Sequence, residues 1–467
     1  MRQLYVSLLL VVMGLAVQAE EQRVVVVLDD GTRIEGLLIE YGSRVYRFRI
    51  GAQVVEIPEE KVQEIQFQRG PSAGTPERPA RPRGDQVRPV DGSNATGAAI
   101  QASLLWMARH QHADGGWSAG RFAERCVGGA CAGKGDEFSE AGCTALAVLA
   151  FLEAGELPAS ATQVTDPLDP SRVYRYGEVV RNGLVRLVKS QKPDGGFTSA
   201  ETFKRMRDDA LATMAMARAF GLTSATEWEE PARKAVGYVC AARNPGAVWR
   251  FMPRCGDNDS LITGWCATAL QVAEDAGIEV DPQAWPAVRT WYDTVTDPES
   301  GKVGYVSRED AGMKVVTVGS ISNEDFQNHE TYTAIGMVYR RIGLADAAGD
   351  ENVARGRSLL AQDLPRWNKT AKSNDYGYWY WGTRALFPSG RSPQGGNDTS
   401  WTAWAEAAAD ALVGHQARDG CAAGSWDADD RWGFEGGRVW ATALNAMTLD
   451  LCHRDPNAAA GTGSERK

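Results

Sequence analysis

Two kinds of apolar pattern alternate along most of the chain. Six segments are amphipathic, with one apolar stripe at helical spacing: 102–111, 183–191, 232–240, 285–292, 354–364 and 401–416. Six others are apolar on almost every side: 141–152, 210–220, 261–273, 331–342, 379–387 and 439–451. A helix with one apolar stripe lies on a surface, whereas a helix that is apolar all round must be buried all round. The alternation predicts a mainly α fold, an inner ring of helices inside an outer ring, with six pairs forming an α6/α6 toroid. The period alone leaves closure of the ring open.

The N-terminal part has a period of two instead. Five short segments rich in β-branched residues occur between residues 22 and 68, at 23–28, 33–38, 45–50, 54–57 and 62–67. Asp29-Asp30-Gly31-Thr32 joins the first two as a hairpin turn. This pattern predicts a small SH3-like or Sm-like β barrel, preceding the toroid, that serves as an adaptor or interaction module.

The remaining segments complete the predicted domain organisation. Residues 1–19 combine Arg2, a short apolar run and a small-residue end at Ala19, which predicts a signal peptide and an exported protein, periplasmic or extracellular. An uncleaved N-terminal anchor is the alternative, and no later segment is apolar enough to be a transmembrane helix. Residues 69–96 are a Pro/Gly/Arg linker, 97–454 form the toroid, and 455–467 form a flexible tail.

Composition narrows the classes of partner. The chain has 467 residues, 43% hydrophobic and 24% charged, as in a folded globular protein. Its net charge of -10 argues against nucleic acid as a partner. Its 50 Gly and 15 Trp are an excess that we attribute to the turns and the inner ring of the repeats.

The 8 cysteines favour disulfides in an oxidising compartment. Proximity in sequence suggests three pairs, although connectivity stays open: Cys126 with Cys131, Cys240 with Cys255, and Cys421 with Cys452. Cys143 and Cys266 lie in apolar segments and are expected to be free, buried thiols. Because no CxxC pair occurs, we predict no structural zinc site, no other metal and no cofactor.

One loop motif recurs between outer and inner segments. It reads Gln-His-Ala-Asp-Gly-Gly-Trp at 111–117, Gln-Lys-Pro-Asp-Gly-Gly-Phe at 191–197, and Gln416 to Gly420 leading to Trp426. Asp-Gly-Gly supplies a tight turn with positive φ, Gln bonds the loop backbone, and the aromatic ring fills the gap between helix ends.

This motif resembles the QW-type repeat of the prenyltransferase and squalene-oxidase repeat superfamily, which includes triterpene cyclases and protein prenyltransferase β-subunits. The resemblance covers about 97–454. The stretches 376–387, 401–404 and 436–444 resemble an exported, planctomycete-type branch of that superfamily. The resemblance implies the terpenoid cyclase-like toroid and says little about activity.

The chemistry of that superfamily is only partly matched. Cyclases use an aspartic acid in a DxDD motif, and Asp427-Ala428-Asp429-Asp430 matches it literally, but Arg431 and Glu435 nearby predict a solvated turn. Asp257-Asn258-Asp259-Ser260 is better placed, before an inner helix, although Asp259 also suits an N-cap. Prenyltransferases hold zinc, for which the candidates are Asp257, Asp259, Cys255 and His329, with spacing that does not fit.

Acidic residues also gather before the inner helices, at the end that we call the mouth. They are Glu137, Glu140, Asp208, Asp209, Asp257, Asp259, Glu324, Asp325, Glu330 and Asp375. Carboxylates there either cap helices or act as paired catalytic acids in glycoside chemistry. His329 and Glu330, with Asp257 and Asp259, are weak catalytic candidates. The candidate ligand-binding residues are Trp265, Tyr332, Asp375, Tyr378, Trp379, Trp381 and Trp440.

These observations favour a non-catalytic toroid that binds a ligand or partner, because the scaffold motifs are intact and the catalytic ones are not. The partner class stays open among a small molecule, a glycan and a protein. The alternative is an enzyme, either terpenoid cyclase-like or carbohydrate-active, that uses acids at the mouth.

Overall fold

The computed structural model describes residues 23–42, 45–51, 53–67, 89–135, 140–199, 205–308, 321–340, 350–387 and 399–454, with single positions between 310 and 318. The predicted signal peptide, most of the predicted linker and the predicted C-terminal tail lie outside these residues.

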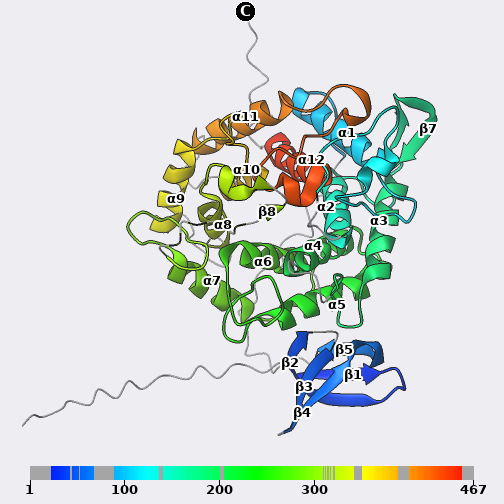
Figure 1. Cartoon of the computed structure of the whole chain (residues 1–467), viewed down its shortest axis with the longest axis vertical. Helices are drawn as coiled ribbons and strands as arrows, with labels where there is room; N and C mark the ends of the chain where they lie inside the picture. Colours follow the sequence, from blue (N-terminus) through cyan, green and yellow to red (C-terminus); the bar gives the residue numbers. More distant parts are fainter. Residues whose placement is uncertain are drawn as a thin grey trace, which may run out of the picture.

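In the described residues, twelve α-helices form two concentric rings (Figure 1). The outer helices are α1 (Ala95–Arg109), α3 (Tyr176–Ser190), α5 (Thr226–Ala242), α7 (Ala284–Val295), α9 (Glu351–Gln362) and α11 (Thr399–Val413). The inner helices are α2 (Glu140–Glu153), α4 (Arg205–Thr223), α6 (Ser260–Asp275), α8 (Thr331–Arg340), α10 (Tyr376–Leu386) and α12 (Gly433–His453). Within the described residues, every segment that the pattern assigned to a ring overlaps a helix of that ring. The predicted mainly α toroid is therefore confirmed.

The ring is closed. Each inner helix packs against the next, and α12 packs against α2, so the last inner helix meets the first. The outer helix α1 contacts the last outer helix, α11, and the last inner helix, α12. Inner helices such as α2 and α4 are buried along nearly their whole length because they have helices on both sides and an outer helix behind. Closure thus removes the exposed apolar ends that an open array would leave.

The recurring loop motif joins neighbouring units. The side-chain amide of Gln111 donates to the Gly115 carbonyl oxygen in its own loop (2.8 Å) and to the Val179 carbonyl oxygen on the next outer helix (2.9 Å). Gln191 makes the equivalent pair of hydrogen bonds. The side-chain amide of Gln416 donates to the Ala99 carbonyl oxygen at 2.8 Å, so the same contact links the last unit to the first.

Tryptophans plug the same loops. The indole N–H of Trp117 donates to the Met107 carbonyl oxygen (2.8 Å), and that of Trp426 to the Leu412 carbonyl oxygen (2.9 Å). Trp249 makes the same bond to Val239 (2.8 Å) in a loop that lacks the Asp-Gly-Gly sequence. Each of these indole side chains thus packs against the C-terminal end of an outer helix and hydrogen-bonds a carbonyl oxygen there.

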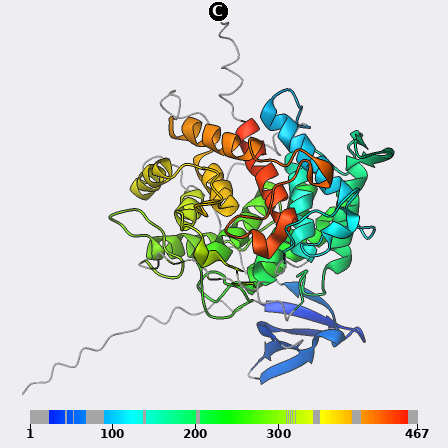
Figure 2. The same ribbon diagram turned by 45° about the horizontal axis from the view of Figure 1, so that its top comes forward.

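The N-terminal segment forms a five-stranded antiparallel sheet with the order β4-β3-β2-β1-β5. Its strands are β1 (Arg23–Leu28), β2 (Arg33–Gly42), β3 (Val45–Ile50), β4 (Gln53–Pro58) and β5 (Val62–Phe67). Its small core of Val26, Tyr46, Phe48, Ile57 and Val62 also includes Ala241 of α5. The sheet therefore lies at the edge of the ring beside α5 (Figures 1 and 2).

The disulfide predictions are wrong, because none of the eight cysteines forms a disulfide. Cys240 is buried in α5 while Cys255 is exposed, and the Cys421 sulfur lies 3.5 Å from the Nε2 atom of His110 instead of meeting Cys452. Cys126 and Cys131 are close but share His110 with Cys421. Cys143 and Cys266 are buried free thiols, as predicted. In the part of the chain that the structure describes, no helix is long and apolar enough to cross a membrane.

Candidate functional site

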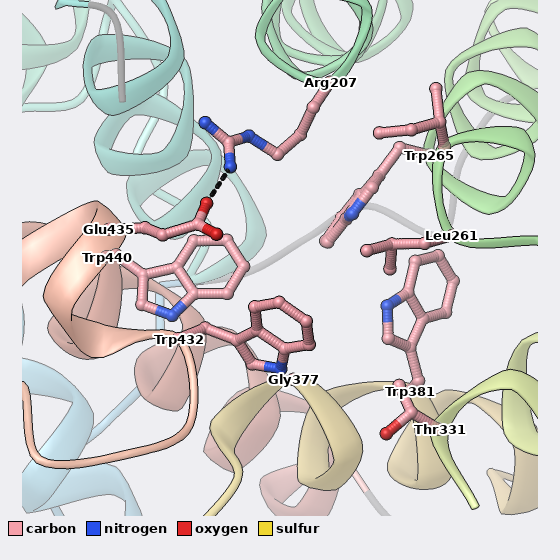
Figure 3. A pocket seen from close by; sticks show the side chains of 10 residues that line it. Arg207, Leu261, Trp265, Thr331, Gly377, Trp381, Trp432, Glu435 and Trp440 are labelled. Carbon is pink, nitrogen blue, oxygen red and sulfur yellow. Dashed lines mark hydrogen bonds and ion pairs between the residues drawn. The ribbon is translucent and has the colours of Figure 1, made fainter. Parts of the chain in front are cut away.

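A pocket opens at the mouth, where the N-terminal ends of five inner helices converge (Figure 3). It encloses about 450 Å³ of empty space, including its open side. Its lining comprises Arg207, Leu261, Ile262, Trp265, Thr331, Gly377, Trp381, Trp432, Glu435 and Trp440. The lining residues come from α4, α6, α8, α10 and α12 and the turn before α12, so only the closed inner ring brings them together.

Indole rings form most of the pocket wall. The Trp265 ring packs against two other indole rings of the wall, with its centroid 4.7 Å from that of Trp381 and 6.4 Å from that of Trp440. Tyr380 also stacks on Trp265, at a centroid distance of 5.8 Å. Trp432 completes the wall on the α12 side (Figure 3). Stacked, buried rings have few rotamers open to them, so the wall is a preformed apolar surface.

One buried ion pair supplies the charge in the pocket. The guanidinium of Arg207 contacts the Glu435 carboxylate at 2.6 Å (Figure 3) and the Asp208 carboxylate at 2.8 Å. Burial works to lower the pKa of Arg207, but the two carboxylates outweigh it and raise the pKa, so the arginine stays charged. Because Glu435 belongs to α12 and Arg207 to α4, the pair also connects two inner helices across the mouth.

Two further acids, Asp375 and Asp430, lie close to Trp432 but do not line the pocket. Asp375 accepts a hydrogen bond from the backbone N–H of Tyr378 (2.8 Å), capping α10, and lies 3.6 Å from the guanidinium of Arg431. Asp430 accepts backbone N–H bonds from Tyr376 and Trp432, both at 3.3 Å. Burial and the neighbouring Asp375 carboxylate raise the pKa of Asp430 well above its usual range. Both effects favour the protonated form of Asp430.

The prediction of a solvated turn at the DxDD match is wrong. Asp430, Arg431 and Glu435 are each 1% exposed. Of the three acids of the match, Asp427 and Asp429 are partly exposed, and both pair with Lys369. The sequence suggested solvent because charges are dense there. The chain after Trp426 instead folds back into the mouth, where Arg431 meets Asp375 and Glu435 meets Arg207.

Asp257 and Asp259 are not in the pocket. Asp259 caps α6 by accepting a hydrogen bond from the backbone N–H of Ile262 at 2.7 Å, which is the capping role the sequence allowed. Asp257 is exposed and pairs with Arg250 at 3.3 Å. The structure gives both residues structural partners.

His329 and Glu330 also have partners away from the pocket. The His329 ring bridges the Asp363 carboxylate (Nδ1 to Oδ2, 2.7 Å) and the Ser373 carbonyl oxygen (Nε2 to O, 3.0 Å). Burial lowers the pKa of His329, but the hydrogen bond to Asp363 and nearby carboxylates outweigh it and raise the pKa. Glu330 pairs with Lys302 at 2.9 Å.

Three of the seven predicted ligand-binding residues line the pocket: Trp265, Trp381 and Trp440. The others pack elsewhere: Tyr332 stacks on Tyr305, Tyr378 stacks on His329, Trp379 packs on Trp367, and Asp375 caps α10.

Sequence reasoning missed Arg207, Trp432 and Glu435. A signal for Arg207 was available, since a charged residue that begins an otherwise apolar inner helix must have a buried partner.

Comparisons with known proteins identify the fold. No family model and no curated protein sequence matches the chain. Among solved structures, an inactive variant of the α-1,6-mannanase GH76A of Salegentibacter sp. HEL1_6, in complex with α-1,6-mannotriose, aligns with a TM-score of 0.50 and 11% identity over 77% of this chain and 99% of that chain. The type II terpene cyclase MstE from Scytonema aligns with a TM-score of 0.45 and 13% identity over 77% of this chain and 98% of that chain. At such low identity, the mannanase likeness shows the fold alone, an α/α toroid.

Proposed function

We propose that the protein binds a small apolar ligand in the indole-walled pocket and carries out no chemistry on it. The observation that carries this proposal is the pairing inside the pocket: the charged lining groups, Arg207 and Glu435, neutralise one another, and the remaining wall is mostly apolar. A site of this kind gains affinity by removing apolar surface from water.

The enclosure of the pocket by five inner helices favours a small molecule over a protein partner. Its empty space of about 450 Å³ includes the open side, so the space available to a ligand is smaller than that. Glu435 is the single carboxylate among the described lining residues, whereas glycoside hydrolysis uses a facing pair. A prenyl alcohol such as farnesol or geranylgeraniol is therefore a better probe ligand than an oligosaccharide.

Quenching of tryptophan fluorescence tests the proposal, since four indoles surround the pocket. We expect saturable quenching by farnesol or geranylgeraniol and none by α-1,6-mannotriose. Leu261→Arg places a charge in the pocket and is expected to weaken prenyl alcohol binding at least about tenfold, because burying an unpaired charge is costly. The matched control is Leu222→Arg, at the far end of an inner helix, which should bind like the wild type. Equal binding by Leu261→Arg, or preferential binding of mannotriose, would contradict the proposal.

Asp430 favours a second candidate, an isoprenoid cyclase. A buried carboxyl group whose pKa is raised, close to an aromatic pocket, can supply a proton to an alkene, and aromatic faces stabilise the resulting cation. If this activity exists, incubation with a linear polyprenyl substrate gives cyclised product, and Asp430→Asn abolishes it. Asp429→Asn, whose carboxylate pairs with Lys369 at the surface, is the control and should keep the activity.

The predicted export adds a location to this function. A signal peptide at residues 1–19 would place the toroid in the periplasm or outside the cell, with the small β-sheet as an interaction module. N-terminal sequencing of the protein from the source cells tests the cleavage after Ala19, and an intact Met1 would contradict it.

A further inference from the structure

Four metal-binding side chains meet at the seam where the ring closes. His110 follows the last residue of α1, Cys126 and Cys131 lie in the loop before α2, and Cys421 lies between α11 and α12. The Nε2 atom of His110 and the three sulfurs all lie within 4.8 Å of one another. The cluster is largely buried, with Cys126 the one partly exposed member. It is separate from the indole-walled pocket and shares no residue with it.

The spacing of these atoms fits one central ion. The Nε2 atom of His110 lies 3.5 Å from the Cys126 sulfur, 3.8 Å from the Cys131 sulfur and 3.5 Å from the Cys421 sulfur. Tetrahedral zinc, with bonds of about 2.3 Å to sulfur and about 2.0 Å to nitrogen, separates a sulfur from a nitrogen ligand by about 3.5 Å. A disulfide would join two of the three sulfurs and leave the third without a partner.

The surrounding groups prepare these four side chains as metal ligands. The Nδ1 atom of His110 lies 2.7 Å from the Trp106 carbonyl oxygen, which can only accept, so Nδ1 carries the proton and Nε2 offers its lone pair. The His110 ring is also stacked on the Trp106 ring at 4.2 Å. The backbone N–H of Cys131 donates to the Cys126 sulfur, and that of Val127 to the Cys421 sulfur, both at 3.1 Å. Such N–H donors stabilise thiolates.

The loop between the two neighbouring cysteines is shaped for this purpose. Cys126 and Cys131 are separated by Val-Gly-Gly-Ala, a spacing within the C-x2–4-C range of zinc sites. Gly128 and Gly129 have φ values of +74° and +147°, which turn the chain so that both sulfurs point to one place.

We propose that His110, Cys126, Cys131 and Cys421 bind one structural Zn²⁺ ion. Three thiolates and one imidazole form a soft, four-coordinate donor set that suits zinc. Because protein atoms fill all four positions, the ion has no open position for a substrate, and its role is structural.

The proposed ion connects the first helical unit to the last. Cys421 is the only ligand from the C-terminal end, and its carbonyl oxygen also accepts a hydrogen bond from Arg109 at 3.2 Å. Without the ion, closure of the outer ring at this place depends on such hydrogen bonds and on packing. Because such a site rarely exists in the unfolded chain, the free energy of binding the ion adds to the stability of the closed ring.

Elemental analysis of the full-length protein, purified without chelators from cells supplied with zinc, tests the proposal. We expect one zinc per chain. Cys421→Ser and Cys126→Ser should lose zinc, while Cys255→Ser and Cys266→Ser, which alter an exposed and a buried cysteine elsewhere, should keep it. Zinc retained at full occupancy by Cys421→Ser would overturn the proposal, as would wild-type protein that stays metal-free after reduction and incubation with Zn²⁺.

A spectroscopic measurement covers the case in which a variant fails to fold. Wild-type protein reconstituted with Co²⁺ should show the intense visible d–d bands of tetrahedral cobalt and sulfur-to-cobalt charge transfer. Zinc chelation should lower the melting temperature of the wild type and leave that of Cys421→Ser unchanged. Octahedral cobalt spectra, or a Cys126–Cys131 disulfide found by mass spectrometry in protein purified without an oxidant, would also overturn the proposal.

Discussion

Substitution of Arg207 tests how much the buried ion pair in the pocket contributes to the stability of the fold. Its side chain is 6% exposed, and those of its partners Asp208 and Glu435 are 0% and 2% exposed. Arg207→Met leaves two buried carboxylates without this counter-charge. Removing one partner of a buried ion pair typically costs about 3–5 kcal/mol of unfolding free energy. We therefore expect Arg207→Met to lower the free energy of unfolding by about that amount.

Glu435→Gln provides the comparison. The arginine keeps Asp208 in that variant, so the expected loss is smaller, about 1.5–3 kcal/mol, the worth of a hydrogen bond to a charged group. In the double variant the two losses should fall short of their sum by about 0.5–3 kcal/mol, because the two residues interact directly.

Urea unfolding followed by circular dichroism measures all three variants. Arg233→Met is the matched control: its pair with Glu229 on α5 is exposed, and we expect a loss within about 0.5 kcal/mol. The reasoning is refuted if Arg207→Met costs no more than Arg233→Met, or if the two single losses simply add in the double variant.

Three further predictions concern turns and titrating groups. Gly424→Ala should lower the free energy of unfolding by about 1–3 kcal/mol more than Gly420→Ala does. Both glycines have positive φ, but only at Gly424 would a Cβ atom collide with the Ala102 carbonyl oxygen. Equal losses in the two variants would contradict this prediction. Burial raises the pKa of Asp450 to about 7, although the charge of Arg454 works to lower it. The folded state therefore binds a proton more tightly than the unfolded state, and this group's contribution to stability falls as the pH rises from about 4 to 7. Asp450→Asn should reduce this fall by up to about 4 kcal/mol in urea unfolding at pH 4 and pH 8, and an unchanged pH slope argues against it. The pKa of His329 is raised in the folded state, so its charged pair with Asp363 stabilises the fold below about pH 6.5. This stabilisation is lost as the pH rises through the folded-state pKa. His329→Gln should therefore lower the free energy of unfolding more at pH 6 than at pH 9.

The helical pattern was enough to place both rings because burial is encoded locally. A helix that is apolar all round, such as 141–152, has only one kind of position available to it, and α2 occupies that position. The glutamine of the loop motif was likewise assigned correctly to the loop backbone. Its second hydrogen bond, to the neighbouring outer helix, was not foreseen, because that acceptor lies in another unit.

The candidate site was only partly predictable. Trp265, Trp381 and Trp440 could be assigned to the inner ring, but ring position does not show which aromatic side chains face the pocket, and Tyr332, Tyr378 and Trp379 do not. The density of charged residues at 427–435 also led to the wrong prediction of a solvated turn. Partners such as Arg207 for Glu435 and Lys369 for Asp429 are remote in sequence, so a dense run of charges resembled a solvated turn.

The sequence by itself determined the architecture: helix type, ring assignment, the N-terminal sheet and the turns follow from spacing within a few residues. Only the tertiary structure decided the chemistry. Closure brings α12 against α2 and Cys421 to His110, and it gathers lining residues from five inner helices in one pocket. Such groups are separated by up to hundreds of residues, and no local pattern specifies which distant side chains will meet. The cysteines show this most directly: pairing by proximity in sequence was wrong, because three of them converge on one histidine across the seam of the ring.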